Sequence, residues 1–123
     1  MDYLEEFPIL IIDDELHSDT AEGRASREII KELKDEGFSI IEALNARDGV
    51  HAFLSHPHAS CIVIDWELTP EAADGMLTAA DVITLIRERN PKVPIFLNTE
   101  KLAISAIPLS VISRIDGYIW KLE

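Results

Sequence analysis

The stretch Cys61-Ile62-Val63-Ile64-Asp65-Trp66-Glu67 decides the fold. Its first four residues are apolar, three of them are β-branched, and the run ends abruptly in a carboxylate. A run without polar alternation is typical of a strand buried on both faces, as in a parallel sheet covered by helices. Ligands of open parallel sheets bind just beyond the carboxyl ends of the strands. Asp65 is therefore the first candidate for a functional residue.

A second run has the same pattern, because Pro8-Ile9-Leu10-Ile11-Ile12 is followed directly by Asp13-Asp14-Glu15. These two runs are the most apolar in the chain, which predicts that they form the two central strands. Parallel neighbours end at the same edge of a sheet. We therefore expect both strands to deliver acidic side chains to one shared edge.

The rest of the chain alternates strands with helices. Strands are predicted over residues 8–12, 38–44, 60–65, 93–98 and 118–120, and helices over 20–36, after Asn45, and over 78–90. Asp19 with Glu22 predicts the cap of the first helix, and Ala25, Ile29, Ile30 and Leu33 predict its apolar face. Residues 100–115 have a helical pattern that Pro108 interrupts, so two short turns joined by a kink are expected.

This order predicts an α/β fold with a doubly wound, five-stranded parallel sheet in the strand order 2-1-3-4-5. No helix is predicted after the fifth strand, so we expect the helix that would cover this strand to be absent. We therefore expect the chain to be the N-terminal fragment of a longer one. Tyr118, Ile119 and Trp120 on that strand would then leave apolar surface exposed.

Length and charge narrow the class of protein. The 123 residues predict one domain, residues 1–123, whose chain buries roughly two-thirds of its unfolded surface. A net charge of −12 argues against binding to nucleic acid or to an anionic membrane, and it suits a basic protein or a metal cation. No apolar stretch approaches the ~20 residues of a membrane span. Cys61 is the single cysteine and is expected to be a small buried side chain in a reducing, cytoplasmic setting.

If the two central strands are neighbours, Asp13, Asp14 and Asp65 lie close together. At ~5 Å and an effective dielectric of ~20, each pair of ionised carboxylates costs about 3 kcal/mol. Such a cluster must bind a divalent cation, share protons or splay apart. Oxygen ligands of this number suit Mg²⁺. The alternative is that Asp13 and Asp14 only cap the loop that follows their strand and accept backbone hydrogen bonds there.

Two later residues join the same edge, because Thr99 ends the fourth predicted strand and Lys121 follows the fifth. The five side chains together resemble the site of response-regulator receiver domains, which have a flavodoxin-like fold. The resemblance implies that residues 9–15 match the first acidic motif, and that Asp65 matches the phospho-accepting aspartate. It also implies that Thr99 is the switch hydroxyl, that Lys121 is the conserved lysine, and that Mg²⁺ offsets the charge of a phosphoryl group.

Other features depart from a receiver, such as Leu122 after Lys121 where receivers usually carry proline. The chain closely resembles the N-terminal domain of bacterial ornithine/lysine/arginine decarboxylases through residues 7–13, 17–24, 61–66, 96–100, 107–109 and 116–120. In that family a receiver-like wing domain precedes a larger region that uses pyridoxal phosphate. The resemblance implies that this domain has no catalytic activity and no cofactor of its own, apart from a possible Mg²⁺.

Two functions therefore remain open at this point. The first is the wing domain of such a decarboxylase, which is a lyase, with a role in assembly or regulation. Its partners would be the rest of the chain and the neighbouring subunits of a homo-oligomer. The second is a receiver domain in two-component signalling, which accepts a phosphoryl group on Asp65 from a histidine kinase or a small phosphodonor.

Overall fold

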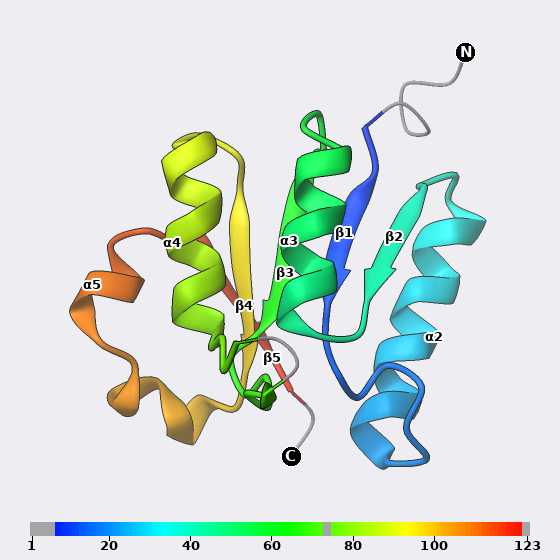
Figure 1. Ribbon diagram of the computed structural model, residues 1–123. Coiled ribbons are helices and arrows are strands. Elements are labelled where there is room, and N and C mark those ends of the chain that lie inside the picture. The colour runs from blue at the N-terminus through cyan, green and yellow to red at the C-terminus, as the bar shows by residue number, and fades with distance from the viewer. Residues whose placement is uncertain (1–6, 73–74, 122–123) are drawn as a thin grey trace.

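A computed structural model describes residues 7–72 and 75–121, which form one sheet with helices packed on it (Figure 1). The strands are β1 (Ile9–Ile12), β2 (Ile40–Ala43), β3 (Cys61–Asp65), β4 (Ile95–Thr99) and β5 (Gly117–Trp120). The helices are α2 (Ala21–Asp35), α3 (Ala46–Ser55), α4 (Ala79–Arg89) and α5 (Leu109–Ile112), with a 3₁₀ helix, η2, at Lys101–Ala106.

The sheet has the order β2-β1-β3-β4-β5 with every pair parallel, which confirms the predicted doubly wound fold. The two apolar runs are neighbours, because β1 pairs with β3 from Ile9 opposite Cys61 to Ile12 opposite Ile64. The residues that follow Ile12 and Ile64 therefore leave the sheet side by side. This register brings the predicted acidic residues to one edge.

Alternate residues of the central strands face two separate apolar clusters. Leu10, Ile12, Ile62 and Ile64 are almost fully buried in the larger cluster, beneath α3 and α4, which lie in front of the sheet in Figure 1. Their sequence neighbours belong to a smaller cluster with α2: Ile9, Ile11, Cys61 and Val63. The continuous apolar runs thus reflect burial on both faces, as predicted.

The loop after β1 contributes to the smaller cluster, which its sequence did not indicate. Leu16 is fully buried there, although residues 15–20 are mostly polar. Arg27 of α2 fixes this loop by donating hydrogen bonds to the carbonyl oxygens of Leu16 at 2.8 Å and Ser18 at 2.7 Å. The loop is therefore an ordered part of the fold that carries the chain from the site to α2.

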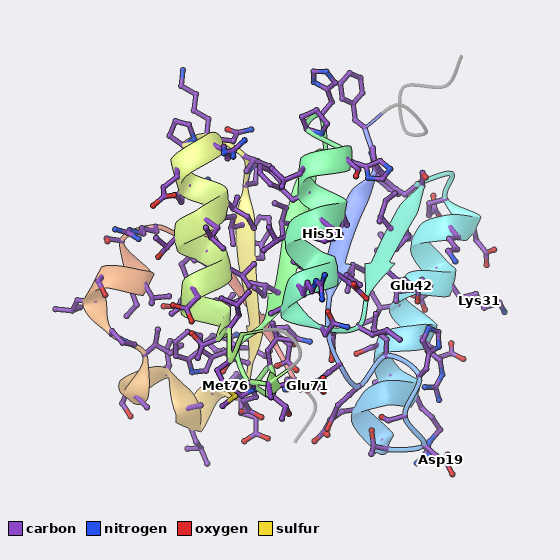
Figure 2. All side chains as sticks on the ribbon, in the orientation of Figure 1. Asp19, Lys31, Glu42, His51, Glu71 and Met76 are labelled. Carbon is purple, nitrogen blue, oxygen red and sulfur yellow. The ribbon has the colours of Figure 1, made fainter. Side chains whose placement is uncertain are left out.

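The cap of α2 differs from the prediction. Thr20 is the N-cap, and its hydroxyl accepts a hydrogen bond from the Gly23 amide at 3.0 Å. Asp19, labelled in Figure 2, instead pairs with Arg24 at 3.0 Å. The side chain of Asp19 is fully exposed. Sequence spacing could not separate the two because adjacent Asp and Thr are both good caps.

The other predicted boundaries are close to the observed ones. Asn45 caps α3, and Thr78 with Asp81 forms a complete capping box at α4. β4 begins at Ile95, directly after Pro94 and two residues later than predicted. Residues 100–115 form η2 and α5 on either side of the Ile107-Pro108 segment, as predicted. β2 is shorter than predicted, because residues 38–39 and 44 lie outside the ladder.

Two apolar side chains are less buried than predicted. Cys61 is only half-buried, and Ile29 of α2 is 52% exposed although it belongs to the predicted apolar face. Both lie on the α2 side of the sheet and line one groove. Over residues 7–72 and 75–121, no helix is long and apolar enough to span a membrane.

Candidate functional site

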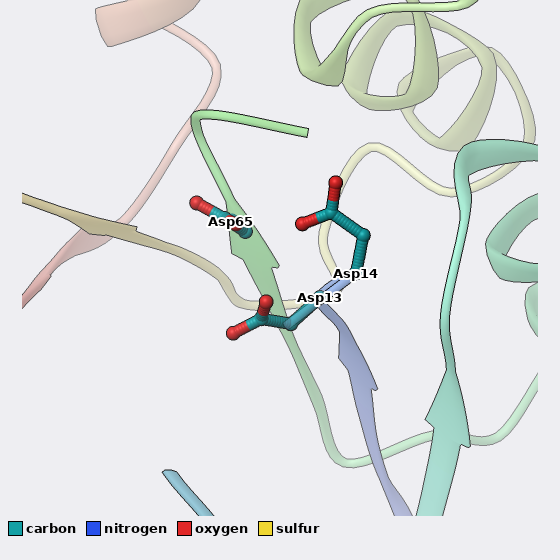
Figure 3. A group of neighbouring side chains, drawn as sticks. All are labelled: Asp13, Asp14 and Asp65. Atoms are coloured by element: carbon teal, nitrogen blue, oxygen red, sulfur yellow. The ribbon is translucent and has the colours of Figure 1, made fainter. Parts of the chain in front are cut away.

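Three carboxylates converge at the carboxyl edge of the central strands (Figure 3). Asp13 and Asp14 follow β1, and Asp65 is the last residue of β3. One oxygen from each of the three side chains lies within 4.8 Å of the others. Asp13 is 5% exposed and Asp65 is 2% exposed, whereas Asp14 is half-buried. The register of two parallel strands is sufficient to create this acidic cluster.

Each carboxylate also holds the loop that follows its strand or a neighbouring loop. Asp13 Oδ1 accepts a hydrogen bond from the Glu15 amide at 2.8 Å, and Asp65 Oδ1 accepts one from the Glu67 amide at 2.9 Å. Asp14 Oδ2 accepts one from the Thr69 amide at 3.1 Å, which ties the β1 loop to the β3 loop. The cluster therefore has the loop-fixing contacts that were the alternative to a metal site.

Lys121, directly after β5, is the cation of the site. Its Nζ lies 2.8 Å from Asp65 Oδ1 and 3.4 Å from Glu67 Oε2. Its side chain is 6% exposed, so Lys121 and Asp65 form a buried ion pair. The Lys121 amide donates a hydrogen bond to the Thr99 carbonyl at 2.9 Å, which extends the β4–β5 pairing past the end of the strand. Sheet pairing thus positions the ammonium group over the end of β3.

Burial and like charge make ionisation of the acids costly. Burial is the main reason that the pKa of Asp13 is raised from 3.8 to about 7, and the nearby charge of Asp65 adds to the effect. Burial also raises the pKa of Asp65, although its hydrogen bond with Lys121 opposes this. Burial alone would lower the pKa of Lys121, but the hydrogen bond and charge of Asp65 outweigh it and leave that pKa raised. Lys121 therefore stays protonated and neutralises one of the buried acids.

Thr99 lies beside this cluster at the end of β4 and is fully buried. In the β4–β5 pairing, Thr99 lies opposite Trp120. In the β3–β4 pairing, the residue before it, Asn98, lies opposite Asp65. The Thr99 hydroxyl donates a long hydrogen bond of 3.4 Å to the Glu100 carbonyl. All five residues singled out in the sequence are thus at the same edge, but the hydroxyl of Thr99 is directed to its own loop.

Glu67 and Asn98 belong to the site and were not predicted. Glu67 contacts Lys121 and supplies the amide that binds Asp65. Asn98, opposite Asp65, lines the groove beside the cluster together with Asp13. The sequence did contain an indication of Glu67, because an acidic side chain two residues after Asp65 can contact the same cation, Lys121. Nothing in the sequence marked Asn98, whose role depends on the strand register.

The fold is similar to that of response-regulator receiver domains. A response regulator receiver domain protein from Clostridium thermocellum superimposes with a TM-score of 0.71, over 93% of this chain and 81% of that chain, at 18% identity. A chain of the CheX–CheY–BeF₃–Mg²⁺ complex from Borrelia burgdorferi also gives a TM-score of 0.71 at 18% identity, over 95% of this chain and 79% of that chain. At such identities the likeness shows the fold alone.

The sequence identifies the family more closely. The model for the Orn/Lys/Arg decarboxylase N-terminal domain matches residues 21–123, so the chain belongs to that family. The chain is 30% identical over 120 residues to the lysine decarboxylase LdcA of Pseudomonas aeruginosa. The aligned segment makes up 95% of this chain and 16% of LdcA. The solved structure of lysine decarboxylase A from Pseudomonas aeruginosa superimposes with a TM-score of 0.73 at 26% identity, over 96% of this chain and 16% of that chain. The chain thus spans about 16% of the length of these relatives.

Proposed function

We propose that this chain is the wing domain of a pyridoxal-phosphate-dependent ornithine/lysine/arginine decarboxylase, in which it serves assembly or regulation and not catalysis. The observation that carries the proposal is the family match over residues 21–123, together with a relative that is 30% identical over 95% of the chain. The much greater length of that relative favours a larger protein in which this domain is one part. The neighbouring subunits of a homo-oligomer are then its natural partners.

The lysines of this domain do not fit pyridoxal phosphate. A lysine that bonds to the cofactor must lose its proton to act as a nucleophile. Lys121 is the one buried lysine, and Asp65 holds it in the protonated form with a raised pKa. The other four, Lys31, Lys34, Lys92 and Lys101, are exposed. We therefore assign pyridoxal phosphate to the remainder of the proposed longer protein.

The acidic cluster supports a further role for Mg²⁺ as a proposal. Asp13, Asp14 and Asp65 supply three carboxylate oxygens of the kind that Mg²⁺ prefers. Burial is the main cause of the raised pKa of Asp13, and the nearby charge of Asp65 adds to it. A bound cation would stabilise the ionised cluster. A rise in the melting temperature with Mg²⁺, lost in Asp13→Asn, tests this assignment, and equal melting curves for both proteins with and without Mg²⁺ would refute it.

A second candidate function is that of a phospho-accepting receiver, which the convergence of Asp13, Asp14, Asp65 and Lys121 favours. Two observations favour the first proposal over it. Asp65 is 2% exposed, and one of its oxygens is already bonded by Lys121 and by the Glu67 amide. An acceptor must present an oxygen to the incoming phosphorus, in line with the leaving group.

Treatment with a small acyl-phosphate donor and Mg²⁺ separates the two functions. We expect the intact mass of the 123-residue chain to be unchanged after incubation at neutral pH. An added phosphoryl group on the wild-type chain, absent from Asp65→Asn and present on the control Asp19→Asn, would establish the receiver function instead.

A further inference from the structure

The outer surface of α3 and α4, which lie in front of the sheet in Figure 1, carries exposed apolar side chains. Leu54 of α3 is 47% exposed and Leu85 of α4 is 39% exposed. Both line a shallow groove of about 100 Å³, together with Glu88 and Arg89 at the end of α4. All residues that line this α3–α4 groove belong to the two helices. The groove is therefore separate from the acidic site and from the α2 side of the sheet.

The exposed stripe of α4 beside this groove is complementary to itself. Asp81, Leu85 and Arg89 are all exposed and are spaced by four residues, which places them on the same side of the helix. The stripe therefore runs from an acid through an apolar residue to a base. Read in the opposite direction it runs from base to acid. Two copies of α4 packed antiparallel would thus bring unlike charges together at both ends.

A two-fold axis at Leu85 produces this arrangement. The Leu85 side chains of the two copies then meet at the axis. Asp81 and Arg89 are each four residues from Leu85, about 6 Å along the helix, so each Asp81 lies opposite Arg89 of the other copy. A two-fold contact repeats every pair, which gives two such ion pairs. Leu54, beside Leu85 in the groove, widens the apolar centre of the contact.

The charged ends of the stripe are not used within the domain as those of other residues are. Arg87 pairs with Asp116 at 3.1 Å, and its side chain is 14% exposed. In contrast, none of the ion pairs among residues 7–72 and 75–121 includes Arg89. Both side-chain bonds between Asp81 and the N-cap Thr78 end on Asp81 Oδ2. A guanidinium group from another copy can therefore approach Oδ1 without breaking the cap of α4.

The net charge of −12 makes two copies repel each other at long range, but this charge lies outside α3 and α4. The two helices carry equal numbers of basic and acidic residues: Arg47, Arg87 and Arg89, and Asp48, Asp81 and Glu88. Repulsion from the rest of the chain is screened over about 8 Å at physiological ionic strength. A strongly basic partner would prefer the acidic edge of the sheet. The balanced α3–α4 surface suits a second copy better.

We propose that a second copy of this domain docks on the α3–α4 groove through a two-fold contact centred on Leu85, with Asp81 of each copy paired to Arg89 of the other. The contact deepens the proposed function and rests on it for its role, which is to link copies of the longer protein. The apolar centre is small, so the 123-residue chain alone should dimerise with a Kd on the order of 0.1 mM, as small transient interfaces do.

Sedimentation equilibrium of the 123-residue chain tests the contact and its register. Arg89→Glu places two acids opposite each other at both ends, and Asp81→Arg does the same with two bases, so each variant should raise the Kd about tenfold or more. A 1:1 mixture of the two variants should dimerise as the wild type does, because every base then lies opposite an acid. Leu102→Glu is the control, since Leu102 is 87% exposed on η2, outside the groove, and should leave the Kd unchanged.

A cross-link provides a second measurement, because Asp81→Arg removes the cap of α4 and can fold poorly. In a Cys61→Ser chain, Leu85→Cys should form a disulfide-linked dimer under a mild oxidant, whereas the control Leu102→Cys should stay mostly monomeric.

A 123-residue chain that remains monomeric up to about 1 mM would overturn the contact. A dimer whose Kd is the same in Arg89→Glu, or a mixture that fails to recover, would overturn it as well. The proposed function fails separately. If the longer protein loses its assembly when residues 1–123 are deleted but not in Arg89→Glu, this contact is wrong and the assembly role stands.

Discussion

At the scale of single residues, the site depends on the charge balance between one buried ammonium, that of Lys121, and two buried acids, Asp13 and Asp65. The Asp65–Lys121 pair satisfies one carboxylate, while Asp13 is left with a pKa near 7. A buried pair contributes little net stability when it forms, but removing one partner leaves an uncompensated charge. The same residues that would perform phosphoryl chemistry in a receiver therefore determine the stability of this edge of the sheet.

Replacement of Lys121 by Met should destabilise the domain strongly. Methionine keeps much of the apolar stem but leaves Asp65 without its cation, at a cost of about 3 kcal/mol near pH 7.5. The loss should shrink at pH 5, where the acids of the site take up protons. Urea unfolding measures both values, and Lys31→Met, at an exposed position on α2 labelled in Figure 2, should change stability by less than about 0.5 kcal/mol. Equal effects of the two substitutions would show that the ion pair is not structural.

The pKa of Asp13 predicts a loss of stability with increasing pH. Its folded-state value of about 7 is above the unfolded value of 3.8, so the folded chain binds more protons between those limits. The contribution of Asp13 to the free energy of unfolding is therefore at its maximum below about pH 4 and decreases as the pH rises towards 7. Asp13→Asn keeps the acceptor oxygen for the Glu15 amide and removes the charge. Without divalent cations it should gain up to about 4 kcal/mol over the wild type at pH 8 and almost nothing at pH 4.

Urea unfolding of Asp13→Asn across this pH range provides the measurement. Asp19→Asn is the control, because the Asp19 side chain is fully exposed, and it should follow the wild type at every pH. A wild-type profile that is flat between pH 4 and 8 would mean that Asp13 ionises in the folded protein at an ordinary pKa.

At the scale of elements, helix α2 links the site to the groove, and its first turn depends on Thr20. Loss of an N-cap hydroxyl costs about 1 kcal/mol because a backbone amide at the helix start is left without a partner. Thr20→Ala should have this effect, and Asp19→Ala should have much less, since Asp19 makes only an exposed ion pair. Thermal unfolding of the two variants compares them directly. A larger loss of stability for Asp19→Ala than for Thr20→Ala would show that Asp19 is the N-cap, as the sequence alone predicts.

Helix α3 approaches β1 so closely that a glycine is required at position 49. A Cβ added to Gly49 would lie 2.7 Å from Cδ1 of Ile12, whose side chain is fully buried. Gly to Ala inside a helix usually stabilises by up to about 1 kcal/mol. Overpacking costs about 1 to 3 kcal/mol and should be the larger effect here. Gly49→Ala should therefore destabilise, and Ile12→Val in the same chain should recover part of the loss in a double-mutant cycle. Additive effects would show that α3 can move away from β1.

At the scale of the whole molecule, the sequence was sufficient for the sheet order and the position of the acids. The runs ending in Asp13 and Asp65 are so apolar that only central strands can bury them, and parallel strands share one edge. The details that were wrong depend on particular side-chain contacts, one of them local and the others tertiary. The choice of Thr20 as the cap depends on one hydroxyl reaching Gly23, Leu16 is buried through the loop that Arg27 fixes, and Ile29 is exposed beside the unfilled groove. None of these contacts leaves a periodic signal in the sequence.

The domain as a whole presents a sheet with one covered face, one partly open face and an acidic edge, which suits a part that binds other parts of a protein. The family match and this architecture support the central claim that the wing assembles or regulates a decarboxylase without taking part in the chemistry. The most direct measurement is to delete residues 1–123 from the proposed longer protein and determine its oligomeric mass and its rate of decarboxylation together. We expect the remaining enzyme to keep its kcat within about twofold and to form a smaller assembly or lose its response to an effector. A kcat that collapses while the full assembly and its regulation persist would contradict the claim.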